Sequence, residues 1–249
     1  MKSKKEMQEN EIENEIGQEI EIENEETDGQ NFVDKLHSFI VQNRIAVIGA
    51  GIGLVILIGF LIYMFSQGEE KGQRASLALS RVLPLYSSGD FEKALKGDNV
   101  AKVRGEDIAG FESIVDQYSG TESGKTAALY AGDCCIKTNK SEEAEKYFEI
   151  AAKSKSTIII TGANAGLGMV REIKGDFKEA STYYEKASQN AEDEVSKLKY
   201  QFYSALCLEK SGDNQKAEKI YKDIIAENQY SEFANQAKTG LIRLGTIIE

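Results

Sequence analysis

Three segments with a common pattern decide the fold: SEEAEKYFEIAA (residues 141–152), DFKEASTYYEKA (176–187) and DNQKAEKIYKDI (213–224). In each segment an alanine is followed by an aromatic residue four positions later, and by a small or aliphatic residue three positions after that. Spacings of four and three place all three side chains on one face of a helix. The triplets are Ala144/Phe148/Ala151, Ala180/Tyr184/Ala187 and Ala217/Tyr221/Ile224, with periods of 36 and 37 residues.

Each of these helices follows another one, so the repeating unit is a pair of antiparallel helices. The first helices carry small residues at corresponding places, in Ala131-Gly132, Leu167-Gly168 and Ser204-Ala205, which allow the two helices of a pair to approach closely. The turns centre on Asn139, Gly175 and Gly212, residue types that accept the left-handed conformation at a helix end. An earlier second helix is expected at 111–119, and residues 230–244 are expected to cap the stack.

These features resemble tetratricopeptide repeats, which are helix–turn–helix units with a period near 34 residues. The resemblance predicts an all-α protein: a single N-terminal transmembrane helix followed by a tetratricopeptide-like solenoid of helical hairpins over residues 106–249. We expect a connecting helix and a looser insertion over 66–105. The match to the repeat pattern is fullest at Leu167, Gly168, Gly175, Phe177, Ala180, Tyr184 and Ala187.

Residues 45–65 read IAVIGAGIGLVILIGFLIYMF, a run of 21 residues without a charge. A helix of this length covers roughly 30 Å, the thickness of one hydrocarbon core. The run is longer than the apolar part of a signal peptide and lacks a small-residue cleavage site after it, so we predict an uncleaved membrane anchor. Gly49 and Gly53 form a G-x-x-x-G pair, which predicts a helix-contact face.

The segment before the predicted span is acidic. Residues 1–44 contain five Lys/Arg and twelve Asp/Glu, a net charge of −7. Self-repulsion and little apolar surface predict a largely disordered tail, either a solvated tether or a docking strip for a basic partner. From 31 to 44 the apolar residues return on one helical face, which predicts a short juxtamembrane helix at the membrane surface.

The composition argues against several functional classes. The net charge of −11 disfavours nucleic-acid binding, and three cysteines with one histidine predict no metal site and no disulfide scaffold. Cys134, Cys135 and Cys207 are expected to be small buried hydrophobic residues. No catalytic constellation is visible, so we predict a non-enzymatic protein without a cofactor or a small-molecule substrate.

One stretch resembles a nucleotide-binding loop. Residues 161–168, TGANAGLG, resemble the T-G-x-x-x-G-x-G loop of short-chain dehydrogenases, which leaves an NAD(P)-binding oxidoreductase as a remote alternative. Only 81 residues follow, no Tyr-x-x-x-Lys pair occurs, and the loop falls on the first helix of the best-matched repeat. We therefore expect a helix at this place.

The resemblance to tetratricopeptide repeats also implies a binding surface. In such stacks the first helices line a concave groove that would hold an extended or helical apolar segment of a partner protein. The alternative is that some of these residues pack beneath the insertion or the terminal helix. The positions that correspond to the groove are Leu129, Asp133, Ala165, Met169, Phe202 and Leu206.

The order of acidic tail, single span and repeat domain resembles the YfgM-type family of bacterial inner-membrane tetratricopeptide proteins. That resemblance implies a single-pass inner-membrane protein with a cytoplasmic N-terminus and a periplasmic repeat domain. It implies an ancillary or chaperone-like adaptor at the Sec translocon, with translocon subunits, periplasmic chaperones or exported chains as partners. Charge flanking the span does not set the orientation, and a scaffold in another cell-envelope complex is the alternative.

Overall fold

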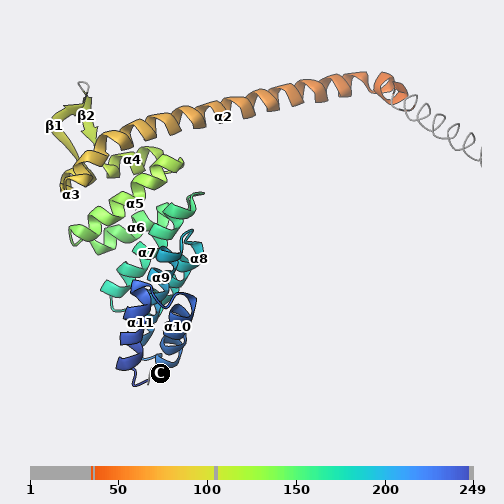
Figure 1. The fold of residues 1–249 in the computed structure, drawn as a ribbon. Helices are drawn as coiled ribbons and strands as arrows, with labels where there is room; N and C mark the ends of the chain where they lie inside the picture. The colour runs from red at the N-terminus through yellow and green to blue at the C-terminus, as the bar shows by residue number, and fades with distance from the viewer. Residues whose placement is uncertain (1–34, 36, 104–105, 247–249) are drawn as a thin grey trace, which may run out of the picture. The chain divides into compact units, whose positions relative to one another are not determined.

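The computed structural model describes residues 35, 37–103 and 106–246, and it confirms the all-α fold with a helical solenoid (Figure 1). The long helix α2 (Arg44–Ser87) is followed by α3 (Phe91–Lys96) and a two-stranded antiparallel hairpin, and the rest is helical. The hairpin consists of β1 (Gly97–Val103) and β2 (Glu106–Ala109). The later helices are α4 (Phe111–Tyr118), α5 (Glu122–Lys137), α6 (Ser141–Ala151), α7 (Thr157–Ile173), α8 (Phe177–Asn190), α9 (Glu194–Lys210), α10 (Asn214–Glu227) and α11 (Glu232–Arg243).

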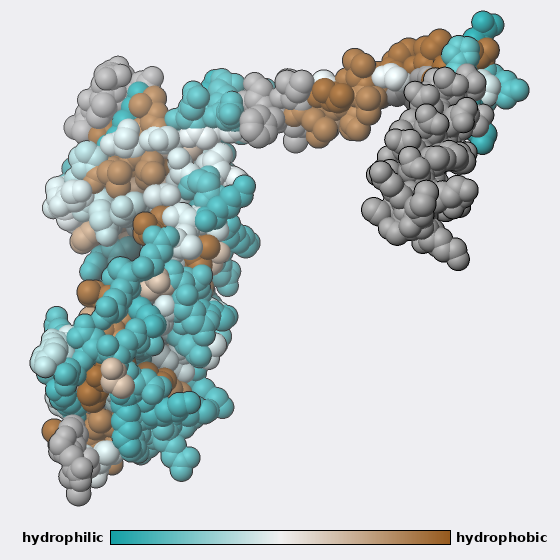
Figure 2. Space-filling model, turned by 45° about the vertical axis from the view of Figure 1, so that its right-hand side comes forward, coloured by the Kyte–Doolittle hydropathy of each residue, from teal (hydrophilic) through white to brown (hydrophobic). Residues whose placement is uncertain are grey.

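The chain divides into two units, Met1–Phe65 and Ser66–Glu249, and α2 runs through the boundary. In the first unit, Arg44–Leu61 is long and apolar enough to cross a membrane. Figure 2 shows the apolar side chains on the visible face of this part of α2. Residues 37–42 are also helical, and a turn at Asn43 separates them from α2. Of the predicted acidic tail, residues 1–34 and 36 lie outside the described residues.

The second unit is a stack of helix pairs, α5–α6, α7–α8 and α9–α10, with the predicted turns between them. Asn139, Gly175 and Gly212 have φ angles of 60°, 81° and 86°, as the left-handed helix end requires. The N–H three residues past the last residue of each helix donates to a carbonyl five residues back, as Asp176 does to Arg171 at 2.9 Å. The turn prediction is therefore confirmed at all three places.

The aromatic residue of each repeated triplet packs on at least one glycine of an adjacent helix. The Phe148 ring lies between Gly132 of α5 and Gly166 of α7, where an added Cβ would come within 2.6 Å and 2.5 Å of the ring. Tyr184 packs in the same way on Gly168. All nine triplet residues are buried, so the predicted core face is confirmed. Glycine at these places lets a large ring enter between two helices.

The structure confirms the earlier second helix expected at 111–119 as α4 and completes its repeat. The last turns of α2 act as a first helix, and a turn at Gly89 with φ 83° leads into α3. The Asp90 N–H donates to the Leu85 carbonyl at 3.0 Å, the same bond as in the later turns. The second helix of this pair is interrupted: α3 ends at Lys96, the hairpin follows, and α4 resumes at Phe111. The part of 66–105 that was expected to be a looser insertion therefore contains the helix α3 and the first strand of the hairpin.

Two glycines close the base of the hairpin and bring α3 and α4 together. Gly97 pairs with Ala109 across the strands. A Cβ on Gly110 would lie 2.3 Å from the Leu95 carbonyl oxygen and 2.4 Å from the Gly97 nitrogen, so only glycine permits this approach of two backbones. Lys96 and Glu112 form a 2.6 Å ion pair across the junction. The hairpin is thus an insertion in an otherwise repeated second helix.

Glu122 ties the start of α5 to the loop between α6 and α7. Its carboxylate accepts hydrogen bonds from the Ser154 hydroxyl at 2.6 Å, the Lys155 N–H at 2.9 Å and the Lys125 ammonium at 2.8 Å. Burial opposes ionisation, but these three donors outweigh it and lower the pKa of Glu122 to about 2. The charged form is therefore stabilised in the folded state.

A carboxylate with a lowered pKa in the folded state stabilises the protein above its unfolded pKa, and this stabilisation disappears as the pH falls. Glu122→Gln should therefore lower the midpoint of thermal unfolding at pH 7, and the difference from the native chain should shrink between pH 4.5 and 2. The measurement is circular dichroism in mild detergent across this range. Glu149→Gln, on the exposed side of α6, is the control. A difference independent of pH would show that Glu122 does not act through its charge.

Candidate binding groove

The first helices of the stack line a groove of ≈ 340 Å³ that is rich in aromatic side chains. It extends from the last turn of α2 across α5 and α7 to α9, with rings from α6 and α8 at its base. Its lining residues are Tyr86, Leu129, Tyr130, Asp133, Phe148, Gly162, Ala165, Gly166, Met169, Tyr184, Lys199, Tyr200 and Tyr203. The groove therefore draws on four successive helix pairs.

The structure brings four of the six groove residues suggested by the sequence into this cavity. They are Leu129, Asp133, Ala165 and Met169, from α5 and α7. Met169 has 43 % of its surface exposed, which is high for a large apolar side chain in a repeat domain. The same side chain is thus both accessible and part of the groove wall.

The other two residues lie elsewhere. Phe202 is only 7 % exposed, and its ring centroid lies 5.9 Å from that of Tyr221 and 6.2 Å from that of Phe233. Leu206 packs against the same C-terminal core. The physical reason is that α11 packs on α9 and α10 and covers this face. Phe202 and Leu206 therefore belong to the core of the last helix pair.

Helix α9 contributes Lys199, Tyr200 and Tyr203 to the groove instead. The Tyr203 ring lies 5.5 Å from that of Tyr184, and the Lys199 ammonium lies 5.2 Å from the Tyr200 ring and 5.9 Å from the Tyr203 ring. Sequence reasoning missed these residues because it carried the register of α7 over to α9. Three aromatic residues within 200–203 were the signal that this helix buries two faces.

Small residues of α7 lie along the groove. A Cβ on Gly162 would lie 3.1 Å from the Leu129 side chain, and one on Gly166 would overlap the Phe148 ring. Together with Ala165, these positions give α7 three small residues along the groove, and Met169 is the large side chain that α7 contributes. The floor of the groove is therefore formed by Ala165 together with the Leu129 side chain and the Phe148 ring, which occupy the space beside the two glycines.

The end of the groove at α2 and α5 is polar. The Tyr86 hydroxyl donates to the Asp133 carboxylate at 2.7 Å, and the Tyr86 ring lies 4.9 Å from the Tyr130 ring. Burial and this hydrogen bond raise the pKa of Tyr86, so the phenol stays protonated and remains the donor. The hydrogen bond fixes the position of the Asp133 carboxylate in the groove wall.

The stretch that resembles a nucleotide-binding loop is helical. Residues 161–168 lie in the middle of α7, where the backbone N–H groups are used within the helix. A phosphate-binding loop needs free N–H groups at the start of a helix. The remote alternative of a dinucleotide site at 161–168 is therefore wrong.

The three cysteines are buried and unpaired, as expected. Burial raises the pKa of Cys134 and Cys207 to about 12 and that of Cys135 to about 11. Thiols with such values are poor nucleophiles and poor metal ligands. Among the described residues, no group of three or more His, Cys, Asp or Glu side chains is placed to hold a metal ion.

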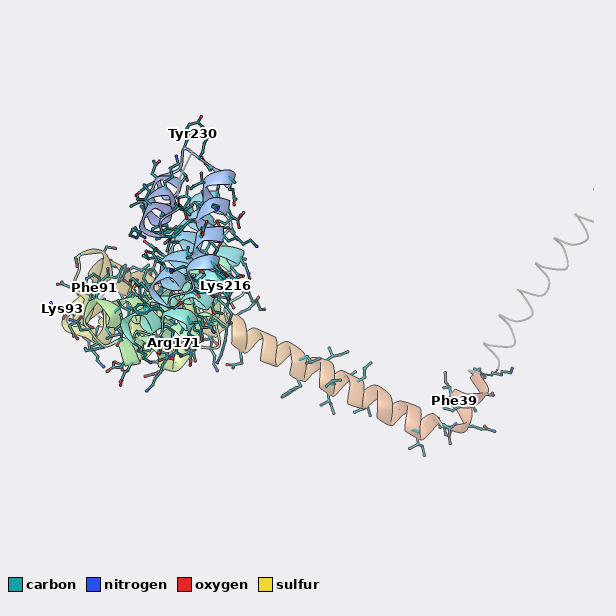
Figure 3. The ribbon with its side chains drawn as sticks, turned by 90° about the horizontal axis from the view of Figure 1, so that it is seen from below. Phe39, Phe91, Lys93, Arg171, Lys216 and Tyr230 are labelled. Atoms are coloured by element: carbon teal, nitrogen blue, oxygen red, sulfur yellow. The ribbon has the colours of Figure 1, made fainter. Side chains whose placement is uncertain are left out.

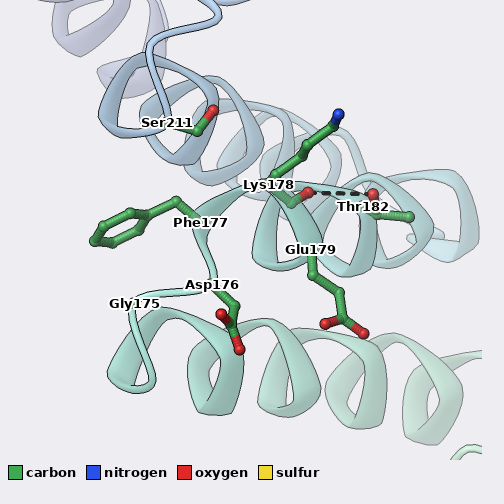
Figure 4. A pocket seen from close by; sticks show the side chains of 7 residues that line it. All are labelled: Gly175, Asp176, Phe177, Lys178, Glu179, Thr182 and Ser211. Carbon is green, nitrogen blue, oxygen red and sulfur yellow. Dashed lines mark hydrogen bonds between the residues drawn. The ribbon is translucent and has the colours of Figure 1, made fainter.

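A second hollow lies between the turns of the last two helix pairs (Figure 4). It is lined by Gly175, Asp176, Phe177, Lys178, Glu179, Thr182 and Ser211. The Thr182 hydroxyl donates to the carbonyl of Lys178, a bond within one helix. The hollow is an open gap between two turns, and its side chains do not converge on a common point.

Comparison with known proteins supports the repeat assignment. The family model described as tetratricopeptide repeat matches residues 162–194, which cover most of α7 and all of α8. The chain contains a tetratricopeptide repeat. The match and the all-helical structure together support a protein of the tetratricopeptide repeat type. No curated protein matches the sequence.

The predicted contact face in the apolar helix is not part of this groove. Within the described part of the chain, no atom apart from the adjacent backbone of α2 lies within 4 Å of the position that a Cβ on Gly49 or Gly53 would take. Both glycines are exposed on α2. A helix contact at Gly49 and Gly53 remains a prediction.

Proposed function

We propose that this chain is a non-enzymatic, membrane-anchored adaptor whose aromatic groove binds a segment of a partner protein. The observation that carries the proposal is the groove itself, in which the exposed Met169 and an apolar floor lie among tyrosine rings. Rigid aromatic side chains give large contact areas at low entropic cost, and methionine adapts to different ligand shapes. Tetratricopeptide repeats generally mediate binding between proteins, which supports the same function.

We propose that residues 45–65 anchor the chain in a membrane and that residues 31–44 form a short helix at its surface. The apolar stretch Arg44–Leu61 supports the anchor. Within the segment before it, Phe39 and Val41 are exposed on the helical residues that precede the turn at Asn43 (Figure 3). Anchoring keeps a weakly binding groove close to membrane-bound partners and so raises its effective concentration.

The more specific proposal is an ancillary role at the Sec translocon, with a cytoplasmic N-terminus and a periplasmic repeat domain. Support comes from the resemblance in segment order to the YfgM-type family and from the groove. Exported chains are unfolded when they leave a translocon, and their apolar segments suit such a surface. The partners proposed are translocon subunits, periplasmic chaperones or the exported chains themselves.

The test is affinity purification of the tagged full chain from its own membranes in mild detergent, with mass spectrometry of the co-purifying proteins. Met169→Glu places a charge in the groove wall and should sharply reduce recovery of the partners. Ile242→Glu makes the same change at an exposed apolar position of α11 outside the groove, and should leave recovery unchanged.

Translocon subunits recovered with periplasmic chaperones would support the translocon assignment. Enrichment of a different membrane complex that is still lost with Met169→Glu would favour a scaffold in another cell-envelope assembly. Equal recovery with native chain and Met169→Glu would show that the groove is not the binding surface.

A further inference from the structure

Lys199 is a cation without an acidic partner in an aromatic groove. Its ammonium lies over the rings of Tyr200 and Tyr203, and it forms no ion pair within the part of the chain that the structure describes. The neighbouring lysines on α9 differ from it, because Lys197 pairs with Glu227 and Lys210 with Glu172, each at 2.6 Å. A cation held against tyrosine rings keeps its charge available to an anion on the open side.

Asp133 is the matching anion at the other end. Its carboxylate accepts a hydrogen bond from the Tyr86 hydroxyl and has no cationic partner among the described residues. One acceptor bond leaves most of the capacity of a carboxylate unused. Asp133 lies on α5 and Lys199 on α9, with α7 between these helices (Figure 1). The groove therefore has one free negative end, one free positive end and an apolar middle.

The middle of the groove suits a single large apolar side chain. Ala165, Leu129 and the Phe148 ring form its apolar floor, with Leu129 and Phe148 packed on Gly162 and Gly166, and tyrosines from α5, α8 and α9 line the space beside them. The volume of ≈ 340 Å³ is small, at the lower end of the range for ligand sites. A side chain such as Leu, Met or Phe would displace water from this floor and bury its surface against the rings.

Resting on the proposed function of this groove, we infer that its ligand is a polypeptide segment with a bulky apolar residue between a basic and an acidic one. The basic residue lies at Asp133, the apolar side chain on the floor of the groove, and the acidic residue at Lys199. Opposite charges at the two ends select one orientation of the segment along the stack, because the reversed arrangement places like charges together.

The experiment uses the full chain in lipid nanodiscs and a random peptide library displayed on phage, with sequencing of the enriched peptides. Lys199→Met keeps the aliphatic stem over the tyrosine rings and removes the charge. Asp133→Asn keeps an acceptor for the Tyr86 hydroxyl and removes the charge. The native chain should enrich peptides in which a bulky apolar residue lies between a basic residue and an acidic residue. The peptides enriched by Lys199→Met should lose only the preference for an acidic residue. Those enriched by Asp133→Asn should lose only the preference for a basic residue.

A synthetic consensus peptide should bind each variant with a Kd about tenfold higher, because each variant removes one charged contact. Enrichment of purely apolar peptides, or a charge preference that neither variant changes, would overturn the inference and leave the proposed function intact. Peptide binding that survives Met169→Glu, or no enrichment at all, would overturn the groove as a binding site and the inference with it.

Discussion

Gly124→Ala should destabilise the repeat domain by about 3 kcal/mol, because the added methyl group has no space. A Cβ at this position in the first turn of α5 would lie 1.8 Å from the carbonyl oxygen of Tyr118, which belongs to the backbone of α4. Helix propensity predicts the opposite sign, a gain of about 1 kcal/mol for alanine inside a helix. The sign of the change in the free energy of unfolding therefore shows which of the two effects is larger.

The measurement is the midpoint of thermal unfolding of the full chain in detergent, which should fall by roughly 10 °C for a domain of this size. Gly120→Ala is the matched control in the same connection between α4 and α5. No atom lies within 4 Å of its Cβ position, and its φ angle is not in the left-handed region. Equal midpoints for both variants would contradict the close approach of α4 to α5.

Phe202→Ala should cost about 3–5 kcal/mol of stability, the usual range for removal of a buried phenylalanine ring. The ring packs between Tyr221 of α10 and Phe233 of α11, so its loss leaves a cavity under the terminal helix. Met169→Ala, in the groove wall, should change stability by less than about 0.5 kcal/mol and instead weaken partner binding. Denaturant unfolding measures the first effect and peptide binding the second.

This pair of variants tests where α9 lies in the stack. If Phe202→Ala left the stability unchanged and reduced binding, Phe202 would line the groove, as the register of the repeats suggested. If Met169→Ala reduced stability as much as Phe202→Ala, Met169 would be a core residue and the groove would not exist in its present form.

Local periodicity predicted most of the repeat domain correctly. The spacing of four and three around Phe148, Tyr184 and Tyr221 identified the second helices, and Asn139, Gly175 and Gly212 identified the turns. These features can be predicted from the sequence because they depend on residues within one helix or one turn. The burial of the three cysteines was predictable for the same reason.

The first helix pair was predicted only through its second helix at 111–119, although a further trace of it is present in the sequence. Gly89-Asp90-Phe91 repeats Gly175-Asp176-Phe177, and Phe111 lies 37 residues before Phe148. The hairpin inserted between α3 and α4 breaks the period between these two traces. Only the approach of Gly110 to the end of α3 shows that the two short helices continue one another.

By itself, the sequence determined the apolar stretch of α2, the helix pairs and their turns, because each follows from hydrophobic spacing over a few turns of chain. The tertiary structure alone decided which side chains of α9 face the groove. Whether Phe202 or Tyr203 is buried depends on α11, which lies about 30 residues further along the chain and covers one face of α9. The pairing of Tyr86 with Asp133 depends in the same way on contacts between different repeats. The repeat pattern specifies the buried helix face that all repeats have in common. The burial of the other side chains depends on which helices pack next to each repeat.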